Sequence, residues 1–154
     1  MLFRSVRVGD EVMALPSRKT SRVKSIVTLD GNLTEAFAPL AVTLTLEDEI
    51  DISRGDMIVR PGNVPRVEQK FEAMVVWMSE EAMVPGKSYW IKQTSKLTPG
   101  TVATLRYRVD VNTLHRNDAP TLKLNEIGRC SILANQPLAY DSYRRNRSSG
   151  AFIL

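Results

Sequence analysis

Segments that alternate apolar and polar residues with a period of two constrain the fold of this chain more than any other feature. Valine and leucines alternate with threonines over residues 42–46, and leucine, tyrosine and valines alternate with arginines and aspartate over residues 105–111. Successive side chains of a strand point to opposite faces, so each segment predicts a strand with one buried face. Less regular patterns predict further strands at Glu11–Leu15, Ser21–Leu29, Met57–Arg60, Phe71–Met78, Ser88–Lys92 and Thr121–Leu133.

Glycine, proline and asparagine separate these strands. They supply the backbone angles at which a chain reverses, so turns are predicted at residues 30–32, 54–56, 61–63, 85–86 and 99–100. In the last expected strand the apolar phase changes after Leu124, which predicts a bulge near Asn125–Gly128. Helical periodicity is weak throughout; its best candidate, Leu33–Phe37, is about one turn long.

Short strands with regular turn signals indicate an all-β fold of antiparallel barrels or sandwiches. The segment 60–66 contains two prolines and a glycine, which interrupt strand ladders. We therefore expect one β unit over residues 1–62 and another over residues 63–154. No stretch approaches the roughly 18 apolar residues of a membrane span, and no secretion signal opens the chain, so a cytoplasmic protein that does not contact membranes is expected.

The charged residues are unevenly distributed. The net charge is +4, but residues 25–86 hold four basic and eleven acidic side chains, whereas residues 87–154 hold eleven and four. A mildly basic surface permits contact with nucleic acid, but the longest arginine cluster is Arg144, Arg145 and Arg147. A solvated surface is the more common explanation of such a balance, and nucleic acid is not the expected partner.

The side chains from which catalytic sites are commonly built are scarce. The single cysteine, Cys130, and the single histidine, His115, exclude intrachain disulfides, thiolate clusters and paired imidazoles. Alternation places Cys130 on the same face as Ile132, as a small buried hydrophobe without a neighbouring base. His115 is expected in a solvated loop after a strand. No phosphate-binding loop, dinucleotide fingerprint or nucleophile elbow occurs, so no catalytic residue, cofactor or metal ligand is assigned to this chain.

Aromatic and acidic residues have structural explanations as well as functional ones. Trp77, Trp90, Tyr89 and Phe71 lie near basic residues, as in a base-stacking surface. Phe71 and Trp77 share a strand face with apolar residues, however, which favours a core role. The acidic run at 47–51 does not form a calcium loop, because adjacent carboxylates of a strand point to opposite faces.

Several phrases resemble translation-factor-like GTPases, and most closely the GTPase subunit of bacterial sulfate adenylyltransferase, including forms fused to adenylylsulfate kinase. The general likeness lies in residues 5–12 (SVRVGDEV), 15–17 (LPS) and 21–26 (SRVKSI). The closer likeness lies in residues 28–33 (TLDGNL), 35–38 (EAFA), 41–56 (AVTLTLEDEIDISRGD), 76–78 (VWM), 85–89 (PGKSY), 107–114 (YRVDVNTL) and 124–128 (LNEIG). These phrases follow the family's order along nearly the whole chain.

The resemblance implies two small β-barrels of the kind found as the second and third domains of translation elongation factors. In the family a GTPase domain precedes them, so GTP and magnesium are expected there and not in this chain. The implied partners are that GTPase domain, the small catalytic subunit that performs adenylyl transfer, and in fused forms the kinase domain. The family continues beyond both ends of this sequence, so incomplete barrels are expected.

The resemblance implies a scaffold that couples the GTPase to its partner. The charged loop after the strand at 42–46 is our candidate for the contact, with Asp48, Asp51, Arg54 and Asp56 as the interface residues. An RNA-binding barrel module of a translation-factor GTPase remains the alternative, and a steep dependence of RNA affinity on salt concentration would distinguish it.

Overall fold

The computed structural model describes residues 5–154, which are almost entirely strands and loops. Contacts divide the chain into two compact units. Unit 1 contains residues 5–67 and Ala139–Asp141, and unit 2 contains Glu68–Leu138 and Ser142–Leu154. The boundary between unit 1 and unit 2 lies after Val67, whereas the boundary expected from the sequence lay after residue 62.

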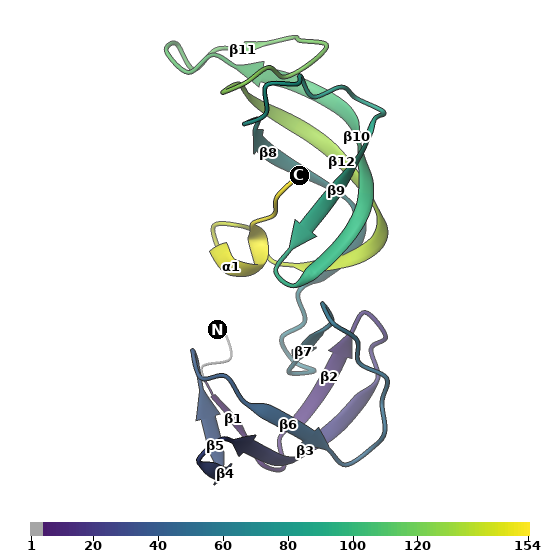
Figure 1. Cartoon of the computed structure of the whole chain (residues 1–154), viewed down its shortest axis with the longest axis vertical. Coiled ribbons are helices and arrows are strands. Elements are labelled where there is room, and N and C mark those ends of the chain that lie inside the picture. Colours follow the sequence, from purple (N-terminus) through teal and green to yellow (C-terminus); the bar gives the residue numbers. More distant parts are fainter. Residues whose placement is uncertain (1–4) are drawn as a thin grey trace. The chain divides into compact units, whose positions relative to one another are not determined.

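Unit 1 consists of short antiparallel strands, drawn in purple to blue in Figure 1. Its strands are β1 (Ser5–Arg7), β2 (Glu11–Leu15), β3 (Thr20–Thr28), β4 (Gly31–Leu33), β5 (Glu35–Phe37), β6 (Thr43–Leu46) and β7 (Met57–Val59). One sheet has the order β4-β3-β2-β7, with β6 also paired to β3, and β1 pairs with β5. The inward side chains of alternating positions form a core around Val12, Val23, Ile26 and Ala36.

The alternation predicted the central strands of unit 1. The prediction for β2 matches its bounds, those for β6 and β7 differ by one residue at one end, and that for β3 differs by one residue at each end. The one-turn helix at Leu33–Phe37 is wrong, because β4 ends at Leu33 and β5 begins at Glu35. Gly31 has a φ of 121°, which reverses the chain into β4, and Leu33 and Ala36 both pack on the core.

Unit 2 is built on two long curved strands, β10 and β12, that run through it (Figure 1). Its elements are β8 (Arg66–Val76), β9 (Ser88–Gln93), β10 (Lys96–Val109), β11 (Arg116–Asn117), β12 (Ile127–Tyr140) and α1 (Arg147–Gly150). The sheet order is β11-β10-β12-β8, with β9 also paired to β10. The register between β10 and β12 shifts at Ala103 and Arg106. Such bulges bend a strand and strengthen its twist.

The core of unit 2 confirms the structural interpretation of Trp77, Phe71 and Cys130, whereas Trp90 is 63% exposed. Trp77 is 7% exposed, packs edge-to-face on Tyr89 at 5.5 Å between ring centroids, and donates its indole N–H to the backbone oxygen of Glu81 at 2.6 Å. Phe71 is partly buried and packs edge-to-face on Phe152. Cys130 and Ile132 are fully buried on the same face of β12.

Three predictions for unit 2 are wrong. Pro99 and Gly100 do not form a turn but lie inside β10, where Gly100 pairs with Tyr89 on one side and Ala134 on the other. The strand expected at Thr121–Leu133 begins only at Ile127 and continues to Tyr140. The bulge expected at Asn125–Gly128 is instead a tight turn, with Asn125 at a φ of 64° and the N–H of Glu126 donating to the oxygen of Lys123 at 3.0 Å.

Other features follow the sequence more closely. β8 begins before and β9 ends just after the predicted bounds, and β10 starts well before Leu105. The short elements β1, β11 and α1 were not predicted, since two to four residues carry too little periodicity. The observed fold class is all-β with antiparallel pairing, as predicted. Within residues 5–154, no helix has the length and hydrophobicity needed to cross a membrane.

Candidate partner interface

The loop between β6 and β7 contains the four residues that the sequence analysis selected. Its first part is held against β3, because the N–H of Glu47 donates to the backbone oxygen of Arg22 at 3.0 Å. The hydroxyl of Ser21, which is buried, donates to the carboxylate of Asp48 at 2.8 Å and accepts from the N–H of Asp48 at 3.1 Å. Asp48 therefore has a structural role at the start of the loop.

The end of the loop is a second fixed point. The N–H of Asp56 donates to the oxygen of Ser53 at 3.0 Å, and the carboxylate of Asp56 accepts from the N–H of Ser53 at 2.9 Å. Gly55 supplies the positive φ of 95° that this turn needs. Asp56 thus closes the turn that leads into β7.

Asp51 and Arg54 lie between these fixed points and are exposed. The structure therefore divides the four candidates into two that secure the loop and two that point a carboxylate and a guanidinium to solvent. A short loop fixed at both ends presents its charges without a large loss of conformational freedom on binding. This arrangement suits contact with a protein surface.

Asp10 is a charged group of unit 1 that the sequence analysis missed. Its carboxylate accepts from the backbone N–H of Arg7 and from the guanidinium of Arg60, both at 3.0 Å. The N–H of Arg7, and then Arg60, lower the pKa of Asp10 below its ordinary value. The residues of this pair are fifty positions apart in the sequence, so no local pattern would have found it.

A second group that was missed crosses three strands of unit 2. Glu72 on β8 binds the guanidinium of Arg129 on β12 at 3.1 Å and that of Arg106 on β10 at 3.2 Å. The hydrogen bond from Arg129 is the largest cause that lowers the pKa of Glu72. Arg116 stacks over the neighbouring Tyr107 ring, at 4.8 Å from its centroid.

The sequence analysis also considered His115 and Cys130. His115 is exposed in the loop between β10 and β11, as predicted. Burial raises the pKa of the Cys130 thiol to about 11, which keeps it protonated and unreactive at neutral pH. Among residues 5–154, no three histidine, cysteine or carboxylate side chains are arranged to hold a metal ion.

Known proteins resemble this chain over nearly its whole length. The chain is 64% identical over 149 residues to the "Bifunctional enzyme CysN/CysC" of Rhodopirellula baltica, which covers 97% of this chain and 23% of that protein. It is 54% identical to "Sulfate adenylyltransferase subunit 1" of Bacteroides fragilis and of Alteromonas mediterranea, again over 97% of this chain. The chain thus spans between about a quarter and a third of the length of these relatives.

Solved structures show the same fold. A structure of Sup35 complexed with GMPPNP matches 96% of this chain and 37% of its own length with a TM-score of 0.82 at 14% identity, and the GDP complex gives 0.86 at 15% identity. These likenesses, with the family match, confirm the predicted fold of translation-factor barrels. The model of the GTP-eEF1A C-terminal domain-like family matches residues 70–154, and the chain belongs to this family.

Proposed function

We propose that this chain is the non-catalytic β-barrel part of the GTP-dependent subunit of a sulfate adenylyltransferase. The observation that carries the proposal is the identity of 54% over nearly the whole chain to proteins named sulfate adenylyltransferase subunit 1. In this role the chain takes part in the synthesis of adenylylsulfate from ATP and sulfate, in the cytoplasm, and binds neither ATP nor sulfate itself.

In this proposal each barrel acts as a rigid body. GTP and magnesium are bound by a GTPase domain elsewhere in the complete subunit, and the small catalytic subunit performs adenylyl transfer. In a fused form a kinase domain is a further neighbour. Rigid bodies that rest on a nucleotide switch transmit its ordering and release to a distant surface. The exposed charges of Asp51 and Arg54, on a loop fixed at both ends, suit such a surface.

The test compares the complete subunit that contains this chain with the chain alone. With the catalytic subunit present, the complete subunit should support GTP-stimulated adenylylsulfate synthesis. The 154-residue chain alone should neither hydrolyse GTP nor make adenylylsulfate, because its sequence contains no phosphate-binding loop. A complete subunit whose presence leaves adenylylsulfate synthesis independent of GTP would refute the proposal.

The loop between β6 and β7 is tested in the same assay. Asp51→Lys should weaken stimulation several-fold at limiting catalytic subunit, since charge reversal at an interface slows association. Its matched control is Asp30→Lys, at an exposed aspartate of the β3–β4 turn. Melting temperatures of both variants should stay near that of the parent. Equal stimulation by Asp51→Lys and Asp30→Lys would remove the loop from the interface.

A further inference from the structure

The outer face of the β9–β10 hairpin exposes large apolar side chains. Trp90 pairs with Pro99, and Lys92 pairs with Leu97 and forms a bridge with Ile153, so these residues lie in adjacent rows of one face. Exposed fractions are 63% for Trp90, 57% for Leu97 and 68% for Ile153. Ile91 and Gln93 are buried on the opposite face. An indole with this exposure in the middle of a sheet leaves much apolar surface in water.

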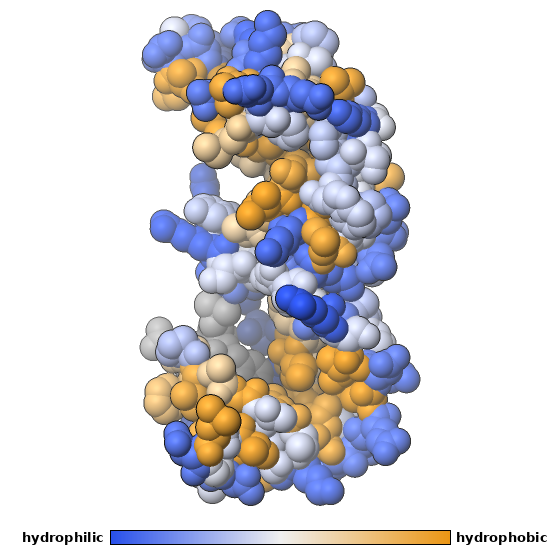
Figure 2. All heavy atoms as spheres, viewed as in Figure 1, coloured by the Kyte–Doolittle hydropathy of each residue, from blue (hydrophilic) through white to orange (hydrophobic). Residues whose placement is uncertain are grey.

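Most cationic side chains near this face are compensated by carboxylates. Lys87 pairs with Glu81 at 3.2 Å, Arg106 and Arg129 pair with Glu72, and Arg108 pairs with Glu126. For Lys92, no ion pair is found among the described residues. Figure 2 shows hydrophobic and strongly hydrophilic residues side by side over β9 and β10. The face therefore combines an apolar patch with an uncompensated ammonium group.

We propose that this face, formed by Trp90, Lys92, Leu97 and Ile153, docks an apolar segment of the catalytic subunit that carries carboxylates. The proposal rests on the proposed function, since it names a surface on which the partner of that function binds. Exposed tryptophans at the centre of a patch are the commonest anchors of protein interfaces. On the partner, a carboxylate would pair with the ammonium group of Lys92, and an adjacent apolar side chain would pack on Leu97 and Ile153.

Nucleic acid fits this face less well. Recognition of a nucleic-acid backbone needs several cations that follow its phosphates. Lys92 instead lies next to the aliphatic side chains of Leu97 and Ile153, which do not bind phosphate groups. Those side chains instead match the apolar interior of a protein interface. RNA binding is therefore treated as an outcome that would overturn the proposal.

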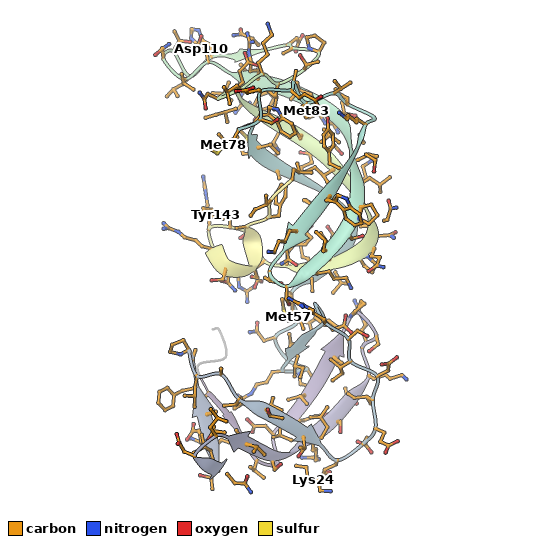
Figure 3. All side chains as sticks on the ribbon, viewed as in Figure 1. Lys24, Met57, Met78, Met83, Asp110 and Tyr143 are labelled. Carbon is orange, nitrogen blue, oxygen red and sulfur yellow. The ribbon has the colours of Figure 1, made fainter. Side chains whose placement is uncertain are left out.

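The experiment measures binding of the purified catalytic subunit to the complete subunit that contains this chain. Trp90→Ala and Lys92→Glu should each weaken the Kd by about tenfold or more, as expected for a central anchor and its charge partner. Matched controls lie in unit 1: Phe37→Ala, at an aromatic residue that is 64% exposed, and Lys24→Glu, at an exposed lysine labelled in Figure 3. Both controls should bind like the parent.

Two further measurements keep the outcomes apart. Thermal melting followed by far-ultraviolet circular dichroism should show that all four variants stay folded. Lys92→Gln should bind the catalytic subunit more tightly than Lys92→Glu if charge reversal is the cause. Should Trp90→Ala and Lys92→Glu bind like the controls while the parent binds well, this docking face is wrong and the proposed function survives. Absence of any binding by the parent would refute the proposed function. Tight binding of transfer RNA that Lys92→Glu abolishes would assign the face to nucleic acid instead.

Discussion

At the scale of single residues, Gly100 shows how a close approach, and not a turn, can require a glycine. Gly100 lies in the middle of β10, between β9 and β12, with no positive φ. A Cβ at this position would lie 2.7 Å from the backbone oxygen of Leu133 and would also overlap the side chain of Ile91. The three strands can therefore pack at this distance only because residue 100 has no side chain.

Gly100→Ala should lower the free energy of unfolding by about 1–3 kcal/mol, the usual cost of an overpacked core. Gly62→Ala is the matched control, because nothing lies within 4 Å of a Cβ at residue 62. It should leave stability unchanged or raise it by about 0.4–1 kcal/mol through a less flexible unfolded chain. Urea unfolding of both variants checks this pair; equal midpoints would show that β9 or β12 moves aside at no cost.

At the scale of elements, the loop after β6 is connected to β3 by side chains as well as by strand pairing. Asp48 forms two hydrogen bonds with Ser21, which is 5% exposed and lies 27 residues earlier in the sequence. A buried hydroxyl that loses its partner keeps the cost of its desolvation. The position of the loop therefore depends on this pair as well as on its own residues.

Asp48→Ala should cost about 1–3 kcal/mol of stability, because it leaves the Ser21 hydroxyl without the carboxylate. Asp51→Ala, three residues further along the same loop, should change stability by less than about 0.5 kcal/mol, as is typical of exposed positions. Chemical denaturation distinguishes the two. The double variant Ser21→Ala with Asp48→Ala should recover part of the loss, and a failure to recover any of it would mean that Asp48 acts through another contact.

At the scale of the whole molecule, both units contain carboxyl groups whose pKa is lowered. The largest causes are the backbone N–H of Arg7 for Asp10, the side chain of Ser5 for Glu35, Arg129 for Glu72, and the N–H groups of Thr113 and Lys123 for Asp110 and Glu126. Each folded pKa lies below the unfolded one, so the folded state favours the ionised form. The contribution of these carboxyl groups to the free energy of unfolding is present at pH values above the ordinary pKa values of 3.8–4.5. It is lost as the pH falls through the lowered pKa values.

The free energy of unfolding should therefore stay level between pH 7 and the ordinary carboxyl values and fall steadily at lower pH. Glu72→Gln should make this fall shallower, because one group with a lowered pKa no longer titrates. Denaturation curves at a series of pH values provide the measurement. Identical slopes for the parent and Glu72→Gln would show that Arg106 and Arg129 do not hold Glu72 ionised in solution.

The sequence by itself determined the elements whose signal is local. Period-two alternation located the central strands and set the inward faces, including that of Cys130 on β12, because side-chain direction in a strand depends on position along it. Phrases along the chain also identified the family. Asp51 and Arg54 were located as exposed charges because the run around them is rich in charged residues.

Only the tertiary structure decided what depends on pairing between distant segments. In the sequence Gly100 has the character of a turn residue, but in the structure β9 and β12 pair with β10 on both sides of it. Asp48 and Asp51 cannot be told apart in the sequence, and only the structure shows that Asp48 accepts a hydrogen bond from Ser21. The exposed face of Trp90 and Lys92 likewise exists because Leu97 and Ile153 arrive beside them from other strands and from the end of the chain. A local pattern fixes which way a side chain points, but its neighbours are set by sheet register, which contacts remote in sequence determine.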